Sequence, residues 1–261
     1  MNPDHVLALY DEYERIHIHE SDTRREAVDD VVRYVNLLSP RSFVLYMDVP
    51  DDEIDAAIYR QIAYFEGVGH GFEWKVFSHD QPADLAERLA RRGFTRGELE
   101  TIMALDLSHL PDALARPIAH DVRRITDPGQ VAGILAIQRK VFEDDDDTHI
   151  VKFLETTLRE RPNEISFYAA YADGIAASAA WLRMPARSPF ASLWGGATLE
   201  AYRGRGLYTS LVAVRAQEAK ARGYQFLTID ASDMSRPICE KQGFVKLCTS
   251  VECDWKSRQN N

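Results

Sequence analysis

The sequence predicts an α/β protein of the α+β type, in which two mixed, mostly antiparallel sheets are each flanked by helices. Short apolar runs alternate with amphipathic helical stretches in both halves of the chain. Two prolines punctuate the middle of the sequence, between residues 108 and 120. The length of 261 residues suits two domains, because a domain usually holds ~100–200 residues.

The predicted domains cover residues 1–112 and 121–256, with a linker at 113–120. The strand-like run Ile102–Leu107 gives way to Leu110–Pro117, which carries both prolines, and a new strand pattern begins at Asp121. The composition, with 45% hydrophobic and 28% charged residues, is that of a soluble globular protein. Either half is therefore long enough to bury a core of ordinary size.

The second domain begins with a strand that ends at Ile125, followed by two helices. Asp127 is a plausible N-cap, and Pro128 suits the first helical position. Both helices are predicted from apolar residues at helical spacing, first at Val131, Ile134, Leu135, Ile137, Val141 and Phe142, then at Ile150, Phe153, Leu154 and Leu158.

Three apolar runs follow the helices and predict strands. Asp173-Gly174 separates Ile165–Ala172 from Ile175–Leu182, which is a strong hairpin signal. The third run, Phe190–Leu199, contains Gly195-Gly196. Because glycine weakens a strand interior, this pair indicates a bulge or the close approach of another backbone.

In the last part of the domain, the sequence predicts one crossover helix and three further elements. The helix runs from Leu207 to Arg222 and stops at Gly223. A strand at Phe226–Ile229, a short helix at Arg236–Gln242 and a closing strand region at Phe244–Trp255 complete the order β-α-α-β-β-β-α-β-α-β. The early strands form an antiparallel meander, and the segment before the crossover helix lies in one parallel connection.

The segment Arg203-Gly204-Arg205-Gly206-Leu207-Tyr208 leads directly into the crossover helix. The N–H groups of a first helical turn are unpaired and aligned with the helix dipole, so they bind anions such as a pyrophosphate. Gly204 and Gly206 allow the backbone to approach the phosphates, and Arg203 and Arg205 add positive charge. A tight turn with surface arginines is the alternative interpretation.

These residues resemble the GNAT-type acyl-CoA N-acyltransferases. The family's first motif, R/Q-x-x-G-x-G/A after a strand, is matched by Arg203, Gly206 and, imperfectly, Tyr208. The second motif, a strand, a short helix and Gly-Phe, is matched by Leu227–Ser232 and Ile238–Phe244. The resemblance covers about Asp121 to Trp255 and includes the predicted order of elements.

The resemblance implies acetyl-CoA as a co-substrate. Its pantetheine would pair like an extra strand with the backbone near Gly196, and its pyrophosphate would lie over residues 204–209. The implied cofactor-binding residues are Gly196, Ala197, Thr198, Arg203, Gly204, Arg205, Gly206, Leu207, Tyr208, Thr209 and Ser232.

Several positions depart from the family pattern. Tyr208 replaces a small residue, and Ser232 replaces an asparagine that often contacts the cofactor arm. Cys239 stands where a tyrosine often donates a proton to the departing CoA thiolate. It is the one candidate for that acid, with a small buried apolar residue as the alternative. Glu200 either relays a proton or faces solvent.

The N-terminal half resembles a second GNAT-like domain without the glycine loop. Asp84–Phe94 resembles Pro237–Phe244, and a strand at Phe43–Val49, a helix at Asp51–Glu66 and a strand at Phe72–Phe77 repeat the β-α-β order. The strand-to-helix connection here has no glycine and three acidic residues, which would repel a pyrophosphate while capping the helix. We expect a degenerate domain that does not bind CoA and serves as a scaffold or substrate wall.

Charge and residue types exclude several other functions. The 41 acidic and 31 basic residues give a net charge of −10, which disfavours nucleic acid and anionic membranes as partners. Cys239, Cys248 and Cys253 form neither a disulfide framework nor a zinc motif. His17 and His19 lack a third nearby ligand, so no metal site is expected. The acidic run at residues 143–147 is interpreted as a solvated turn and helix cap, or as an attractant for a cationic amine.

The predicted location is the cytoplasm. The segment Met1–His5 lacks the features of a signal peptide, and no apolar run approaches the ~20 residues of a membrane span. The protein is expected to be a monomer or homodimer.

The predicted function is N-acetyltransferase, with acetyl-CoA as acyl donor and a small-molecule or peptide amine as acceptor. One alternative is a non-catalytic acyl-CoA-binding or regulatory module. Another is a dinucleotide-dependent oxidoreductase, because Gly204 and Gly206 precede a helix and Asp230 ends the next strand. Against the latter, Thr209 replaces the third glycine, and the preceding strands do not form repeated βαβ units.

Overall fold

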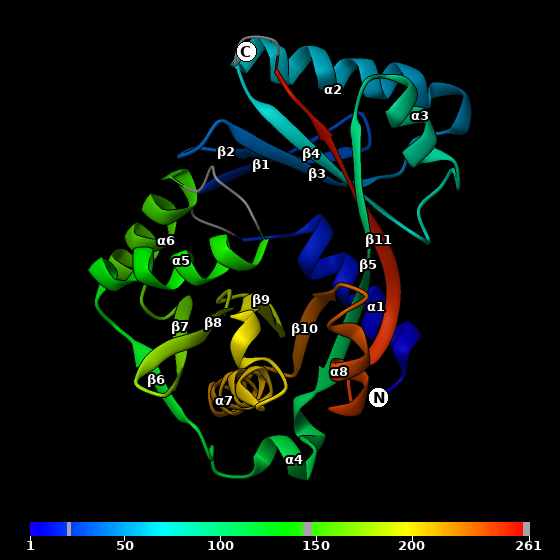
Figure 1. Ribbon diagram of the computed structural model, residues 1–261. Helices are drawn as coiled ribbons and strands as arrows, with labels where there is room; N and C mark the ends of the chain where they lie inside the picture. The colour runs from blue at the N-terminus through cyan, green and yellow to red at the C-terminus, as the bar shows by residue number, and fades with distance from the viewer. Residues whose placement is uncertain (20–21, 143–147, 258–261) are drawn as a thin grey trace. The chain divides into compact units, whose positions relative to one another are not determined.

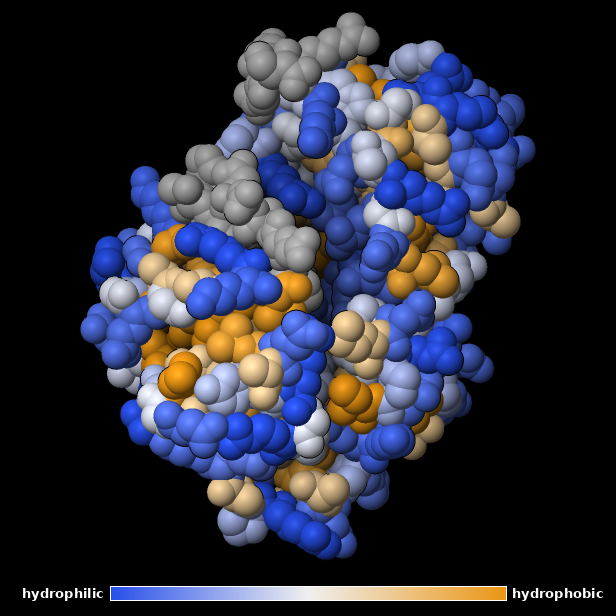
Figure 2. All heavy atoms as spheres, in the orientation of Figure 1, coloured by the Kyte–Doolittle hydropathy of each residue, from blue (hydrophilic) through white to orange (hydrophobic). Residues whose placement is uncertain are grey.

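The computed structural model describes residues 1–19, 22–142 and 148–257. The chain folds into two compact units, which we call unit 1 and unit 2. Unit 1 comprises Met1–Met103, Ala231–Arg236 and Lys246–Asn261, and unit 2 comprises Ala104–Asp230 and Pro237–Val245. The predicted α/β class, with a mixed sheet flanked by helices, is confirmed (Figure 1). Hydrophilic residues dominate the face drawn in Figure 2.

Unit 1 is a mixed sheet with strand order β1-β2-β3-β4-β11. The β3–β4 pair is parallel and the others are antiparallel. Its elements are α1 (Pro3–Asp11), the π-helical η1 (Glu12–Ile16), β1 (Thr23–Val28), β2 (Val31–Asn36), β3 (Arg41–Met47), η2 (Asp51–Glu53), α2 (Ile54–Val68), β4 (Gly71–Phe77), α3 (Leu85–Arg91), the first part of β5 (Thr95–Asp106) and β11 (Val245–Trp255).

The core of unit 1 lies under α2. Apolar residues of α2 repeat at helical spacing, and Ile54, Ile58 and Phe65 are completely buried. They pack on alternate residues of β4, where Phe72 and Trp74 belong to the same cluster. The rings of Phe65 and Phe72 stack with centroids 4.3 Å apart.

Unit 2 contains an antiparallel meander, β6-β7-β8-β9, extended by β10 in parallel to β9. Its elements are the end of β5, η3 (Leu107–His109), α4 (Asp112–Ala115), β6 (Asp121–Ile125), η4 (Pro128–Gln130), α5 (Val131–Phe142), α6 (Thr148–Glu160), β7 (Ile165–Ala172), β8 (Ile175–Arg183), β9 (Phe190–Thr198), η5 (Glu200–Tyr202), α7 (Leu207–Ala221), β10 (Phe226–Ala231) and most of α8 (Arg236–Lys241).

Helices cover both faces of the unit 2 sheet. On one face, α5 and α6 form a cluster with Phe167 and Trp181. On the other face, Leu207 and Leu211 of α7 pack against Tyr168 and other residues of β7 and β8. Because both faces are buried, these strands appear in the sequence as nearly continuous apolar runs.

The predicted linker packs against unit 2. Gln217 of α7 donates hydrogen bonds to the carbonyls of Leu114 and Arg116, at 2.7 and 2.8 Å. A Cβ at Gly243 would lie 2.9 Å from Pro111 Cγ. The segment at 113–120 is therefore fixed to the second unit along part of its length.

The closing strand contributes to unit 1. Residues Ser250–Trp255 of β11 pair antiparallel with Phe72–Phe77 of β4. The predicted domain ranges, 1–112 and 121–256, differ from the two compact units in this strand, in residues 104–112, which belong to unit 2, and in residues 231–236, which belong to unit 1. No helix of the described ranges is long and apolar enough to span a membrane. The acidic run at 143–147 lies outside the described residues.

Candidate functional site

The central feature of unit 2 is the divergence of β9 from β10. The two strands pair in parallel at Phe190↔Phe226, Ala191↔Leu227 and Ser192↔Thr228. Both continue further, β9 to Thr198 and β10 to Ala231, but within the described chain no register is maintained there. The backbone of β9 from Leu193 onward therefore has one edge without a strand partner.

A bulge in β9 accompanies this divergence. Its register with β8 shifts between Ala179 and Trp181, opposite Gly195-Gly196, so the predicted bulge is present. Gly195 has φ of 58°, and a Cβ there would collide with the Trp181 ring and the Gln138 amide. The Gln138 amide also donates to the Gly195 carbonyl. Only glycine fits this position.

Beyond the bulge, side-chain hydrogen bonds fix the end of β9. Ser178 Oγ donates to the Ala197 carbonyl at 2.8 Å and lies 2.7 Å from Thr198 Oγ1. Arg203 Nε donates to the Thr198 carbonyl at 3.3 Å. The predicted residues Gly196, Ala197 and Thr198 thus adjoin the predicted loop through Arg203.

The loop ends at the N-terminus of α7, as the spacing predicts. Gly204 and Gly206 have φ of 72° and 80°, and Gly206 is the N-cap. No side chain caps the helix, so the N–H groups of Leu207, Tyr208 and Thr209 have no capping partner in the described chain. This first turn can therefore bind an anion through its backbone.

The two loop arginines differ in their surroundings. Arg205 forms an ion pair with Asp173 in the β7–β8 turn, with Nη1 at 2.9 Å from Oδ2. Its guanidinium also stacks on the Tyr202 ring, 5.3 Å from the centroid. Arg203 instead bonds to the β9 backbone. The charge that Arg205 adds to the loop is partly neutralised by Asp173.

His120 also lies at this loop, and sequence patterns did not identify it. Its Cε1 lies 3.2 Å from the position of a Cβ at Gly206, so the imidazole covers that glycine. Its Nδ1 lies 2.8 Å from Ser210 Oγ in α7. The contact joins residues far apart in sequence, and no local motif marks it.

Tyr208 and Cys239, two departures from the family pattern, lie in contact. The Tyr208 ring covers Gly196, where a Cβ would lie 2.8 Å from Cε2. Its hydroxyl and the Cys239 thiol form a hydrogen bond. Burial raises the pKa of Tyr208 above its usual range and raises the pKa of Cys239 to about 11. Both groups are therefore protonated at neutral pH.

Two other predicted residues lie on the surface. Ser232 follows β10, belongs to unit 1, and its Oγ accepts a 3.4 Å hydrogen bond from the Ser235 amide. Glu200 begins η5 and is exposed.

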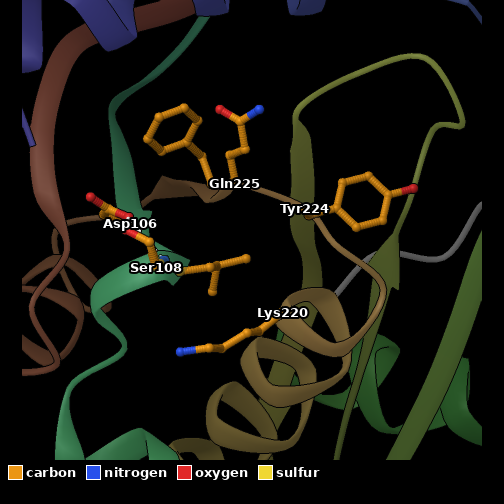
Figure 3. A pocket seen from close by; sticks show the side chains of 7 residues that line it. Asp106, Ser108, Lys220, Tyr224 and Gln225 are labelled. Carbon is orange, nitrogen blue, oxygen red and sulfur yellow. Dashed lines mark hydrogen bonds between the residues drawn. The ribbon is translucent and has the colours of Figure 1, made fainter.

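A shallow hollow of about 360 Å³ lies near the other end of α7, among Asp106, Ser108, Lys220 and their neighbours (Figure 3), and contains none of the predicted site residues.

Unit 1 contains a parallel strand pair that corresponds to β9 and β10, and Arg15 occupies the place where its two strands diverge. Strands β3 and β4 pair from Arg41↔Gly71 to Val44↔Trp74 and then lose register. Arg15, which is 1% exposed, donates from Nε to the Leu45 carbonyl just beyond the last pair, at 2.9 Å. The connection to α2 contains the acidic turn η2 and no glycine.

A family model matches most of the second half of the chain. Residues 131–244 match the Acetyltransferase (GNAT) family. No curated protein matches the chain. The matched range includes the loop, α7 and the Gly243-Phe244 motif.

Solved structures share the fold at low sequence identity. A GCN5-related N-acetyltransferase from Kribbella flavida has TM-score 0.69 and 14% identity, covering 97% of this chain and 95% of that one. A tandem GNAT protein from the clavulanic acid biosynthesis pathway has TM-score 0.59 and 15% identity, covering 98% and 87%. A GCN5-related N-acetyltransferase from Sphaerobacter thermophilus has TM-score 0.60 and 13% identity, covering 88% and 81%. The chain therefore has the GNAT fold along nearly its whole length, and at residues 131–244 it contains a domain of the GNAT acetyltransferase family.

Proposed function

We propose that unit 2 is an acetyl-CoA-dependent N-acetyltransferase that acetylates the amine of a small molecule or a peptide. The observation that carries this proposal is the open edge of β9, which leads through Arg203–Gly206 to the uncapped N-terminus of α7. An extended amide chain and a pyrophosphate at its end match these two features in order.

The proposed cofactor contacts follow the predicted residues. The amides of Leu207, Tyr208 and Thr209 hold the pyrophosphate, with Gly204 and Gly206 allowing its close approach. Arg203 and Arg205 supply positive charge. The backbone from Gly196 to Thr198 pairs with the pantetheine arm in the manner of an added strand. Contact between Ser232 and the cofactor remains a prediction.

In the proposed reaction the neutral amine nitrogen attacks the thioester carbonyl carbon. The C–S bond then breaks, the sulfur takes the electron pair, and water removes the proton from the nitrogen. Holding the amine beside the thioester supplies much of the rate. We assign the proton donor for the leaving sulfur to Tyr208, because its hydroxyl is protonated at neutral pH and its ring lies against Gly196 of β9.

Unit 1 is proposed as a degenerate copy that binds no acyl-CoA. Arg15 fills the gap between its parallel strands, and ion pairs to Asp11 and Asp80, at 2.7 and 2.6 Å, hold the guanidinium there. The acidic turn before α2 would repel a pyrophosphate. The role left to unit 1 is that of a scaffold or substrate wall. A cytoplasmic location and a monomeric or homodimeric state belong to the same proposal.

The test is turnover of acetyl-CoA with a panel of amines, followed by release of free thiol. We expect thiol release that depends on the amine, together with a product heavier by one acetyl group. Acetyl-CoA binding without release for any amine would favour the non-catalytic module. Stabilisation by NAD and not by CoA in a thermal-shift experiment would favour the oxidoreductase.

A further inference from the structure

Arg215 is a buried cation in the middle of α7. Its exposed fraction is 1%, and its guanidinium bonds only to backbone carbonyls. Nε donates to Leu211 at 2.8 Å, and Nη1 donates to Trp181 at 2.9 Å and to Trp194 at 3.4 Å. No carboxylate forms an ion pair with it in the part of the chain that the structure describes.

A buried charge without a counter-ion is energetically costly, because carbonyl dipoles replace only part of its hydration. Burial lowers the pKa of Arg215 to about 10, so the side chain is still charged at neutral pH. The result is a fixed positive potential in a region of low dielectric constant. Such a potential stabilises any negative charge that develops nearby.

These carbonyl contacts place the Arg215 guanidinium next to the β9 bulge. Nη1 bridges Trp181 of β8 and Trp194 of β9, which are paired at the point where the register shifts. The open edge of β9 begins one residue earlier, at Leu193. The pyrophosphate loop lies past the opposite end of this edge, so an acyl-CoA extended along β9 has its sulfur end toward Trp194.

Titratable groups around Arg215 already respond to its charge. The guanidinium lowers the pKa of Tyr208 and of Cys239, although burial has the larger, opposite effect on both. Tyr168 is the third titratable group that interacts with it, and its hydroxyl donates to Glu218 at 2.8 Å. The Cys239 thiol is therefore a sulfur group close enough to Arg215 to interact with its charge.

We propose that Arg215 is a positioning residue of the transferase, which stabilises the thiolate that leaves during acyl transfer and holds the β9 bulge in register. The inference rests on the proposed function. In the step, the sulfur takes the electron pair of the broken C–S bond, Arg215 offsets its negative charge, and Tyr208 then supplies the proton. Arg215 itself exchanges no proton.

Three variants separate charge from structure. R215Q retains hydrogen-bond donors without the charge, R215K retains the charge with a different donor geometry, and R215M removes both. A purely structural role predicts that R215Q is the mildest change. The proposed electrostatic role predicts that R215K is the mildest in kcat, even where its thermal stability is lower than that of R215Q.

The most direct experiment titrates the thiol of CoA bound to the full chain. The ultraviolet absorbance of the thiolate is followed against pH, with the desulfo-CoA complex as a blank. We expect the bound thiol to have a pKa about one unit lower in the wild type than in R215Q, a tenfold difference in thiolate at neutral pH. R215K should resemble the wild type.

In turnover, R215Q should lower kcat roughly 10- to 100-fold with the KM for acetyl-CoA changed less than about threefold.

Equal thiol pKa values in the wild type and R215Q would overturn the inference while leaving the proposed function intact. If R215Q does not fold, the comparison is made between R215K and R215M. Failure of the wild type to bind CoA in calorimetry would instead reject the proposed function, and the inference with it. The two failures are therefore distinguishable.

Discussion

At the scale of single residues, the roles of Tyr208 and Cys239 can be assigned only when the two residues are considered together. In the sequence each is a separate departure from the family pattern. In the structure the Tyr208 hydroxyl bonds to the Cys239 thiol, and the ring rests on Gly196. The thiol is completely buried, and its pKa of about 11 favours the interpretation as a small buried residue. The phenol is the better candidate for proton transfer.

Y208F is expected to lower kcat roughly 100-fold or more, because general acid catalysis typically contributes ~10²–10⁴-fold and phenylalanine keeps the ring on Gly196. C239A should change kcat less than about threefold while reducing thermal stability, because it removes a small buried group. Steady-state kinetics with acetyl-CoA measures both, and Y202F serves as a nearby tyrosine control. The assignment is wrong if C239A impairs kcat more than Y208F does.

At the scale of elements, the β7–β8 turn controls the charge of the loop. Asp173 and Gly174 have positive φ values of 56° and 78°, as expected for the predicted hairpin turn. The turn places the Asp173 carboxylate on Arg205. A carboxylate beside a proposed pyrophosphate site weakens anion binding unless the arginine is released from it.

D173N is expected to tighten acetyl-CoA binding roughly two- to fivefold at low salt, because it frees Arg205 and removes a negative charge. Asparagine tolerates positive φ, and an exposed ion pair contributes little to stability, so the melting temperature should change only slightly. Calorimetry at low and high salt measures the effect. D84N, which removes an exposed carboxylate paired with Arg88, is the control. Weaker binding by D173N would contradict this account of the loop.

Element boundaries were largely predictable where local patterns decide them. The helix expected at Leu207–Arg222 is observed at Leu207–Ala221, and the strand expected at Phe226–Ile229 extends to Ala231. The partner of the closing strand was not predictable, because its pairing with β4 joins two segments that are far apart in the sequence. The contacts of Tyr208 with Cys239 and of His120 with Gly206 were not predictable for the same reason. They depend on packing between distant segments and have no local signature.

At the scale of the whole molecule, the stability of the chain should depend on the ionisation of Glu73 in unit 1. Burial and the neighbouring Glu252 raise the pKa of Glu73 to about 7, while Lys75 and Arg41 act in the opposite direction. The folded-state pKa is above the unfolded value, so the fold favours the protonated acid. The stabilisation is complete below about pH 4.5 and is lost as the pH rises through about 7.

E73Q mimics the protonated acid and should therefore stabilise the chain at pH 8, by roughly 1–3 kcal/mol, with little effect at pH 4. Thermal unfolding at the two pH values measures the difference. The exposed Glu98 of unit 1, changed to Gln, is the control for removal of one carboxylate. Equal effects of E73Q at pH 4 and pH 8 would contradict the expected ionisation.

The proposed function requires a single acyl-CoA site at the N-terminus of α7, and calorimetric titration with acetyl-CoA detects it. G206L should abolish or greatly weaken binding, because the glycine has φ of 80° and a side chain there would meet the His120 ring, which distorts the turn that presents the first amides of α7. G223L is the matched control, since Gly223 follows the same helix with φ of 88° and has open space around it. We expect one bound acetyl-CoA per wild-type chain, loss of binding in G206L and wild-type affinity in G223L. Two sites per chain, or undiminished affinity in G206L, would contradict it.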